Sequence, residues 1–174
     1  HARAMGARIF IDTVTKLDLK ARPFVAHLDS GARITADAVI LATGAQARWL
    51  ELPSEEKFKG FGVSACATCD GFFYRGREVM VIGGGNTAVE EALFLTNFAS
   101  KVTLVHRRDS LRAEKILQER LFKNPKVSVI WDHEVVEVQG DEAPLGVTQV
   151  LLRSTKTGAE QTVPADGVFV AIGH

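Results

Sequence analysis

A glycine-rich turn between two apolar segments is the feature that most constrains the fold of this chain. Residues 78–82 have the composition of a buried strand, and apolar side chains recur at helical spacing between residues 86 and 98. The junction follows a G-x-G-x-x-A pattern made by Gly83, Gly84, Gly85, Asn86, Thr87 and Ala88. A strand, a tight glycine turn and a helix in this order are typical of a βαβ unit that binds a dinucleotide.

Each small residue of the turn has a role in that interpretation. Gly83 permits the tight turn, Gly85 lets a pyrophosphate approach the backbone, and Ala88 lets the helix pack closely on the strand. The helix N-terminus offers free N–H groups and a positive dipole to the phosphates. The alternative is a strand-to-helix turn that binds no ligand, because short motifs also arise without function.

The segments that follow extend the unit. A second strand, a helix and a third strand are predicted at residues 101–105, 111–123 and 127–131. An antiparallel meander follows, with strands at residues 134–138, 146–153 and 161–163 and turns at Gly140 and Gly158. A last buried strand is expected over residues 166–172. The predicted fold class is α/β, with a Rossmann-like βαβαβ domain and a β-meander.

The first part of the chain has a different pattern. Residues 8–11 and 23–28 are short β-rich runs, which predict antiparallel strands. Residues 37–42 are almost continuously apolar and predict a buried strand. A stretch with one proline and two glycines amid charged residues follows and suits a connector between domains. We therefore predict one domain over residues 1–46 and a second over residues 47–174.

The second predicted strand of the βαβαβ unit ends in a basic cluster. An NAD-specific site usually has a carboxylate here for the ribose hydroxyls, whereas this sequence has His106-Arg107-Arg108, with Arg112 close behind. Guanidinium groups match phosphate oxygens with paired hydrogen bonds, so the cluster favours the 2′-phosphate of NADPH. The alternatives are a solvated basic segment offset by nearby acids and, for His106, a packing histidine.

Cys66 and Cys69 are the two cysteines of the chain. At this spacing a cysteine pair serves redox exchange or supplies half of a metal site. Zinc would need two further ligands, and neither a second cysteine pair nor ligand-like histidine spacing provides them, so no metal is expected. Two inert buried thiols are the third alternative. Asp70 follows directly and could move protons during thiol exchange, although an aspartate before Gly71 is also common in turns.

Composition excludes several classes of protein. The chain has 174 residues, of which 46% are hydrophobic and 24% charged, as in ordinary globular proteins. Its 21 basic residues equal its 21 acidic ones, so no overall charge indicates nucleic acid or an anionic membrane. No apolar run approaches the roughly 20 residues that span a bilayer. We expect a cytoplasmic protein, and because the chain begins at His1 we expect a fragment.

Several segments together resemble the bacterial low-molecular-weight thioredoxin reductases. The matching segments are residues 63–73 around the cysteines, residues 81–88 around the glycines, His106-Arg107-Arg108-Asp109 with Arg112-Ala113, Ala42-Thr43-Gly44-Ala45, and residues 170–174. Their order and spacing agree with the family, and the resemblance covers essentially the whole chain. The joint occurrence of a dithiol and a basic pocket is specific to this family.

The resemblance implies a homodimeric flavoenzyme that passes electrons from NADPH through FAD and the dithiol to thioredoxin. It implies that Cys66 attacks the thioredoxin disulfide, that Cys69 lies next to the flavin, and that Asp70 is the acid–base residue. The residues that match a segment close to FAD are Thr43, Gly44 and Ala45. The resemblance thus implies that residues 1–46 are part of an FAD-binding domain and that residues 47–174 are an NADPH-binding domain with the dithiol. Phe72 and Phe73 match apolar residues that dock thioredoxin in the family. The alternative interpretation is that they are ordinary aromatic residues of the core.

The sequence also departs from that family. It lacks the glycine-rich motif at the N-terminus and the Gly-Asp flavin motif at the C-terminus, so we expect these residues to bind NADPH but not to hold FAD unaided or turn over. Two other functions stay open. One is an NADH-dependent flavoprotein that reduces a peroxiredoxin partner, which Arg107 and Arg108 disfavour. The other is a non-catalytic redox or dinucleotide sensor, which gives no reason for Asp70 beside the thiols.

Overall fold

The computed structural model describes residues 2–173 and divides the chain into two compact units, His1–Gly44 and Ala45–His174. His174, the last residue of the resemblance, lies outside the described residues. The first unit contains a short 3-10 helix and an antiparallel sheet, formed by η1 (Ala2–Met5), β1 (Val14–Asp18), β2 (Phe24–Leu28) and β3 (Arg33–Ala36). The assignment of the two regions to FAD and NADPH domains stays a prediction.

Two sequence predictions for the first unit are wrong. Residues 37–42 form no strand, and Ile40 and Leu41 are exposed to 91% and 66% instead of buried. Residues 8–11 are likewise outside any strand and exposed. The physical reason is the same in both cases: an extended segment needs a neighbouring strand to satisfy its backbone groups, and within residues 2–173 neither segment has one.

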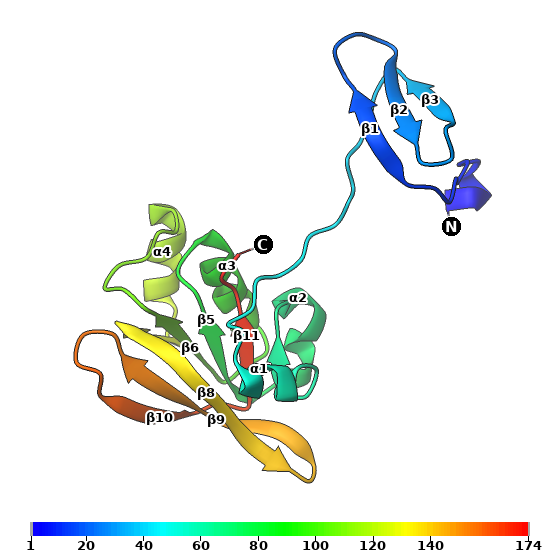
Figure 1. Cartoon of the computed structure of the whole chain (residues 1–174). Helices are drawn as coiled ribbons and strands as arrows, with labels where there is room; N and C mark the ends of the chain where they lie inside the picture. Colours follow the sequence, from blue (N-terminus) through cyan, green and yellow to red (C-terminus); the bar gives the residue numbers. More distant parts are fainter. Residues whose placement is uncertain (1, 174) are drawn as a thin grey trace. The chain divides into compact units, whose positions relative to one another are not determined.

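The second unit is built on a parallel sheet of five strands in the order β4–β11–β5–β6–β7. Its strands β11, β5 and β6 lie side by side in Figure 1. The five strands are β4 (Val63–Ser64), β5 (Glu78–Ile82), β6 (Lys101–His106), β7 (Val127–Trp131) and β11 (Gly167–Val170). All but the short β4 fall where the sequence predicts strands. The crossovers from β5 to β6 and from β6 to β7 contain α3 (Asn86–Leu95) and α4 (Lys115–Lys123), so the predicted α/β class is confirmed.

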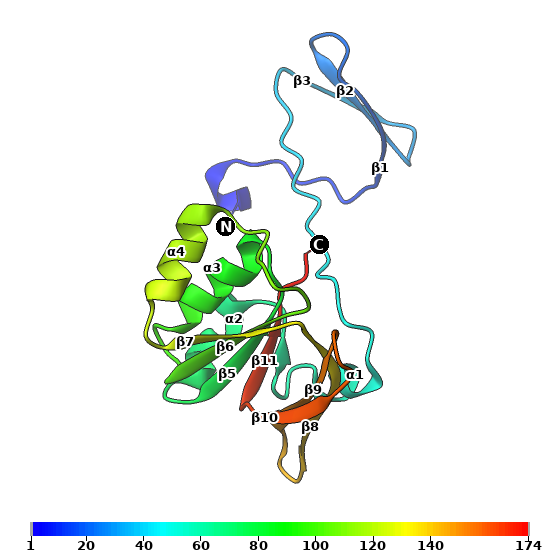
Figure 2. The ribbon, with the colours of Figure 1, turned by 90° about the vertical axis from the view of Figure 1, so that its left-hand side faces the viewer.

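Alternating side chains of the parallel strands pack into two cores. Val79 and Val81 of β5 belong to the core on the side of α3 and α4, whereas Met80 and Ile82 pack against the antiparallel meander. That meander consists of β8 (His133–Glu142), β9 (Leu145–Ser154) and β10 (Glu160–Pro164). The helices and the meander therefore cover opposite faces of the parallel sheet (Figure 2). None of the helices in residues 2–173 is long and apolar enough to cross a membrane.

The turn predicted at Gly140 is wrong. Gly140 lies inside β8 opposite Val147, next to a register shift, and the hairpin turns at residues 143–144. A Cβ at this position would collide with the carbonyl oxygen of Gly146. The glycine is therefore needed for the close approach of two backbones at a bulge and not for a turn. The turn at Gly158 is present, since its N–H donates to the Ser154 oxygen at 2.9 Å.

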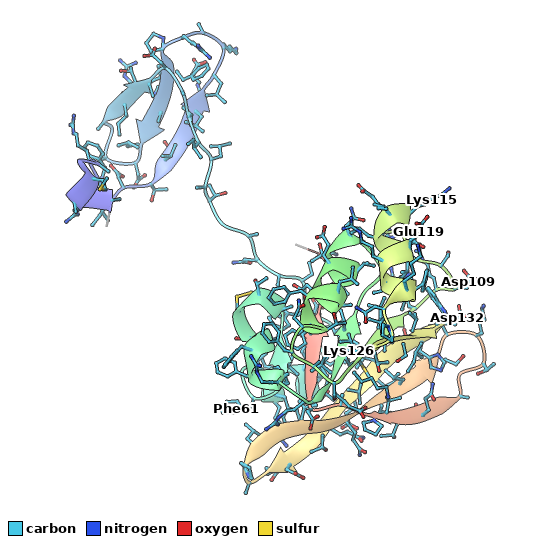
Figure 3. The ribbon with its side chains drawn as sticks, turned by 180° about the vertical axis from the view of Figure 1, so that it is seen from behind. Phe61, Asp109, Lys115, Glu119, Lys126 and Asp132 are labelled. Carbon is cyan, nitrogen blue, oxygen red and sulfur yellow. A yellow bond between two sulfur atoms is a disulfide. The ribbon has the colours of Figure 1, made fainter. Side chains whose placement is uncertain are left out.

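Lys126 holds the C-terminal end of α3, the helix that follows the glycine turn. Its Nζ donates to the backbone oxygens of Thr96 at 2.7 Å and Ala99 at 3.0 Å (Figure 3). These carbonyls lie at and just beyond the helix end, where the dipole is negative and intrahelical donors are missing.

We predict that Lys126→Met lowers the free energy of unfolding by about 1–2 kcal/mol, because both carbonyls lose a charged donor. Urea unfolding of the chain measures this loss. The control is Lys115→Met in the first turn of α4, where a positive charge opposes the helix dipole and no loss is expected. Equal losses in the two variants would contradict the role given to Lys126.

Candidate functional site

The glycine turn brings the end of β5, the start of α3 and the end of β11 into close contact. Gly83 has φ +154°, and a Cβ there would collide with the Ala171 carbonyl oxygen and with the Ala88 side chain. Its N–H donates to the Val105 oxygen at 3.1 Å, which ties the turn to β6. Only a residue without a side chain fits at this point.

Gly84 is required for a different reason, because a Cβ at this position would overlap the imidazole ring of His106. His106 ends β6 and is buried, and its Nε2 makes no hydrogen bond within the described residues. Burial lowers the pKa of His106. A backbone hydrogen bond at Ser110 raises this pKa, whereas the positive charges of Arg108, Arg112 and Arg107 lower it, and the net change is a decrease. The imidazole is therefore neutral at pH 7 and forms part of the packing under the glycine turn.

Gly85 precedes α3 and faces open space. A Cβ built on it would meet nothing within 4 Å, so a ligand can approach the backbone here. The turn lies at the floor of a cleft of about 1330 Å³. Seven of the residues predicted from the sequence line this cleft: Gly83, Gly84, Gly85, Thr87, His106, Arg107 and Arg112.

Two further residues predicted to belong to the nucleotide site, Asn86 and Ala88, support the structure of the glycine turn. Ala88 packs on Gly83, and the Asn86 Oδ1 accepts a hydrogen bond from the Glu114 N–H at 2.8 Å. The Arg112 N–H donates to the Gly84 oxygen at 2.7 Å. These two bonds hold residues 111–114 against the glycine turn, and they explain why α4 begins at Lys115 and not at the predicted Leu111.

The basic cluster has no acidic partner in the described structure. Arg107, Arg108 and Arg112 are exposed, and none of them takes part in an ion pair among residues 2–173. Arg107 and Arg112 line the cleft, whereas Arg108 does not. Two free guanidinium groups beside a helix N-terminus make this end of the cleft suitable for a phosphorylated ligand.

Sequence reasoning missed the opposite wall of the cleft, which residues 47–53 form. Glu55 holds this segment: its carboxylate is fully buried and accepts hydrogen bonds from the Leu50 and Glu51 N–H groups, each at 2.9 Å. Glu55 lies in the first turn of α1 (Pro53–Phe58), two residues after the proline that starts the helix. That local pattern was the available signal for a helix within the predicted connector.

The two cysteines form a disulfide, with their Cα atoms 5.3 Å apart (Figure 3). Cys66 precedes α2 (Ala67–Asp70), and its Sγ accepts a hydrogen bond from the Cys69 N–H at 3.2 Å. Cys69 is exposed, which contradicts the alternative of two inert buried thiols. With the sulfurs bonded to each other, this form offers no thiolate to zinc.

Ser64 connects the disulfide with Asp70, a role the sequence analysis did not give it. Its hydroxyl is buried, donates to Asp70 Oδ2 at 2.6 Å and accepts from the Cys66 N–H at 3.0 Å. One side chain at the end of β4 therefore fixes both the carboxylate and the backbone beside the disulfide.

The disulfide does not lie in the cleft. Cys66, Cys69 and Asp70 are absent from its lining, and α2 packs on the flank of α3 through the buried Ala67. The predicted flavin-contacting residues Thr43, Gly44 and Ala45 are exposed and belong to no helix or strand.

Two aromatic side chains follow the second cysteine closely in the sequence and belong to η2 (Gly71–Tyr74). Phe72 and Phe73 are 61% and 73% exposed, so the core alternative for them is wrong. Their rings make an edge contact with a centroid separation of 6.2 Å, and the Arg75 guanidinium lies over the Phe72 ring. Exposed neighbouring aromatics of this kind suit a protein-docking surface.

Comparison with known proteins gives a family match over nearly the whole chain. The model of the pyridine nucleotide-disulphide oxidoreductase family matches residues 3–174. Among curated proteins, the thioredoxin reductase of Rickettsia felis is 57% identical over the whole chain, which corresponds to 56% of that protein. The thioredoxin reductase of Escherichia coli O157:H7 is 54% identical, with the chain covering 54% of it. The chain thus spans about half the length of these relatives.

Solved structures agree with the sequence relatives. The thioredoxin reductase from Giardia duodenalis matches with a TM-score of 0.84 and 37% identity, over 99% of this chain and 56% of that one. The Lactococcus lactis thioredoxin reductase matches with a TM-score of 0.76 and 41% identity, over 93% and 52% of the two chains.

We predict that Ser64→Ala lowers the free energy of unfolding of the oxidised chain by about 1–3 kcal/mol, because it leaves the Cys66 N–H and a carboxylate oxygen of Asp70 without their buried partner. Urea unfolding without reductant measures the loss. Ser110→Ala is the control, since that hydroxyl contacts an exposed carboxylate at 3.4 Å. A loss no greater than that of the control would show that the Ser64 hydroxyl has no such role.

Proposed function

Because the chain belongs to the pyridine nucleotide-disulphide oxidoreductase family, we propose that it is part of a thioredoxin reductase. The whole protein would pass electrons from NADPH through FAD and the Cys66–Cys69 pair to the disulfide of thioredoxin. The observation that carries the proposal is that one unit holds both a disulfide and a glycine-turn cleft whose Arg107 and Arg112 form no ion pair among residues 2–173. The relatives named thioredoxin reductase support it.

The residues of the cleft fit NADPH. Gly85 leaves the backbone open at the N-terminus of α3, where a pyrophosphate is stabilised by free N–H groups. Arg107 and Arg112 line the same cleft as Gly85 and have no acidic partner within the described chain. Their guanidinium groups can therefore bind the 2′-phosphate. When bound, NADPH supplies a hydride, and these residues contribute binding and orientation.

The residues present do not form a flavin site by themselves. Thr43, Gly44 and Ala45 lie in an exposed segment without secondary structure. FAD is implied by the family and by the relatives, and the chain covers about half of those proteins. We therefore derive no step of the reaction from FAD contacts in these residues.

The roles proposed for the two cysteines follow from the resemblance to thioredoxin reductases. Two electrons and two protons convert the disulfide into two thiols. In the proposed reaction the Cys66 thiolate attacks the thioredoxin disulfide and displaces one thiolate, and Cys69 then attacks the mixed disulfide and releases reduced thioredoxin. Asp70 is the proposed acid–base residue, and Ser64 orients its carboxylate at 2.6 Å. Phe72 and Phe73 are the proposed docking surface for thioredoxin, because they are exposed and closely follow the second cysteine in the sequence.

The two alternative functions differ in what they explain. An NADH-dependent peroxiredoxin reductase would use the same disulfide but has no use for the free arginines of the cleft. A non-catalytic sensor would explain the cleft, but it gives no reason for an Asp70 carboxylate that Ser64 holds by a hydrogen bond beside the disulfide. The proposal also includes a homodimer, as the resemblance to bacterial thioredoxin reductases implies, and the cytoplasmic location expected from the sequence.

We predict that Cys66→Ser in the whole protein abolishes NADPH-dependent reduction of thioredoxin, because the attacking thiolate is lost. NADPH affinity stays unchanged, since Cys66 does not line the cleft. A coupled thioredoxin disulfide assay measures the first quantity and calorimetry the second. Full turnover of the variant, or none in the wild type, would exclude the proposed function.

We predict that Arg112→Met raises the Kd for NADPH by about tenfold, the effect of losing a charge-assisted hydrogen bond, and leaves the Kd for NADH unchanged. Calorimetric titration of the chain with both nucleotides measures this difference. Arg120→Met is the matched control, because Arg120 lies on α4 outside the cleft lining. A wild-type protein that binds NADH as well as NADPH would favour the peroxiredoxin-linked alternative.

A further inference from the structure

Asp132, Thr155 and Lys156 hold the basic segment Arg107–Asp109. Each of them contacts one residue of the segment. The Thr155 Oγ1 lies 3.2 Å from the Arg107 carbonyl oxygen and 3.1 Å from the Asp132 carbonyl oxygen, and its one hydroxyl hydrogen is shared between these two acceptors. The Asp132 N–H donates to the Arg108 oxygen at 3.2 Å. The Lys156 Nζ lies 3.7 Å from Asp109 Oδ2. The whole segment is thus bound to residues that follow β7 and β9.

These three residues are also bound to each other. The Thr155 N–H donates to the Asp132 oxygen at 2.7 Å, and the Lys156 Nζ forms an ion pair with Asp132 Oδ2 at 2.8 Å. Asp132 has φ +56°, a left-handed conformation that aspartate tolerates better than most residues. Figure 3 shows the labelled Asp109 and Asp132 near each other at one edge of the unit. We call Asp132, Thr155 and Lys156 the brace.

The brace completes the attachment of the loop between β6 and α4. At its far end, the loop is already bound to the glycine turn through the Arg112 and Glu114 N–H groups. At its near end, the brace binds two backbone carbonyls and one carboxylate and leaves the arginine side chains free. Fixing the backbone beforehand reduces the entropy that the arginines lose when they bind an anion.

Lys156 has a second effect through Asp109. Asp109 is the one acid within the basic segment, and a carboxylate close to the arginines would compete with a phosphate for them. The Lys156 Nζ pairs with this carboxylate at 3.7 Å and with the Asp132 carboxylate at 2.8 Å. The ammonium group therefore lowers the repulsion that an incoming phosphate would meet.

We propose that Asp132, Thr155 and Lys156 are positioning residues that set the preference of the cleft for NADPH over NADH. This inference rests on the proposed function, because it concerns the same nucleotide site. The brace lies outside the glycine motif and the arginine cluster, and it gives the antiparallel meander a direct part in nucleotide selection.

Thr155→Val tests the hydroxyl contact, since valine keeps the shape and removes the donor. We expect the Kd for NADPH to rise about fivefold, as for the loss of one ordinary hydrogen bond, and the Kd for NADH to change less than about twofold. Calorimetry on the chain with NADPH, NADH and 2′,5′-ADP measures this, and 2′,5′-ADP should follow NADPH. Thr155→Ser keeps the hydroxyl and should restore the wild-type affinities.

Thr157→Val is the matched control in the same turn. Its hydroxyl accepts a hydrogen bond from the Ala159 N–H at 3.3 Å, and no described bond joins it to the basic segment. A wild-type chain without preference for NADPH would refute the proposed function itself. A wild-type preference for NADPH that Thr155→Val leaves intact, as Thr157→Val does, would overturn the brace alone.

A double variant tests the role of Lys156. Lys156→Met should weaken NADPH binding, because the Asp109 carboxylate is then free to approach the arginines. Adding Asp109→Asn removes that carboxylate and should restore the affinity. Failure of Asp109→Asn to restore it would overturn the positioning role of Lys156 and would instead indicate direct contact with the phosphate.

Discussion

The second unit depends on the close packing of the glycine turn against the Ala171 backbone and the His106 ring. The carbonyl of Ala171 at the end of β11 occupies the space of a Gly83 side chain, and the His106 ring at the end of β6 occupies that of Gly84. This packing seats the first turn of α3 on the sheet and buries His106, whose pKa burial lowers. Larger residues would separate the strands from the helix, and the floor of the cleft would be lost.

The parallel order of the strands explains where the polar groups collect. The carboxyl ends of β5, β6 and β11 meet at one edge of the sheet, so the glycine turn, the basic segment and the Ala171 region lie together there. The disulfide is carried by α2 on the flank of α3, and none of its residues lines the cleft.

Much of the fold could be predicted because the local patterns and the packing agree. β5 alternates between two cores, so it is apolar on both faces and reads as a buried parallel strand. The errors occur where a partner decides the outcome. Residues 37–42 are as apolar as β5, yet no strand among residues 2–173 pairs with them. Residues 111–114 fit a helix, but two of their N–H groups bond to the glycine turn.

The sequence by itself determined which groups we propose to react and to bind, because two cysteines at this spacing, a glycine turn and an arginine cluster are local patterns. Tertiary structure alone decided which groups meet. Ser64 reaches Asp70 across six positions, Glu55 holds the wall of the cleft, and Thr155 reaches Arg107 across 48. Such contacts form between side chains and backbones that only packing brings within hydrogen-bonding distance, so no local pattern records them.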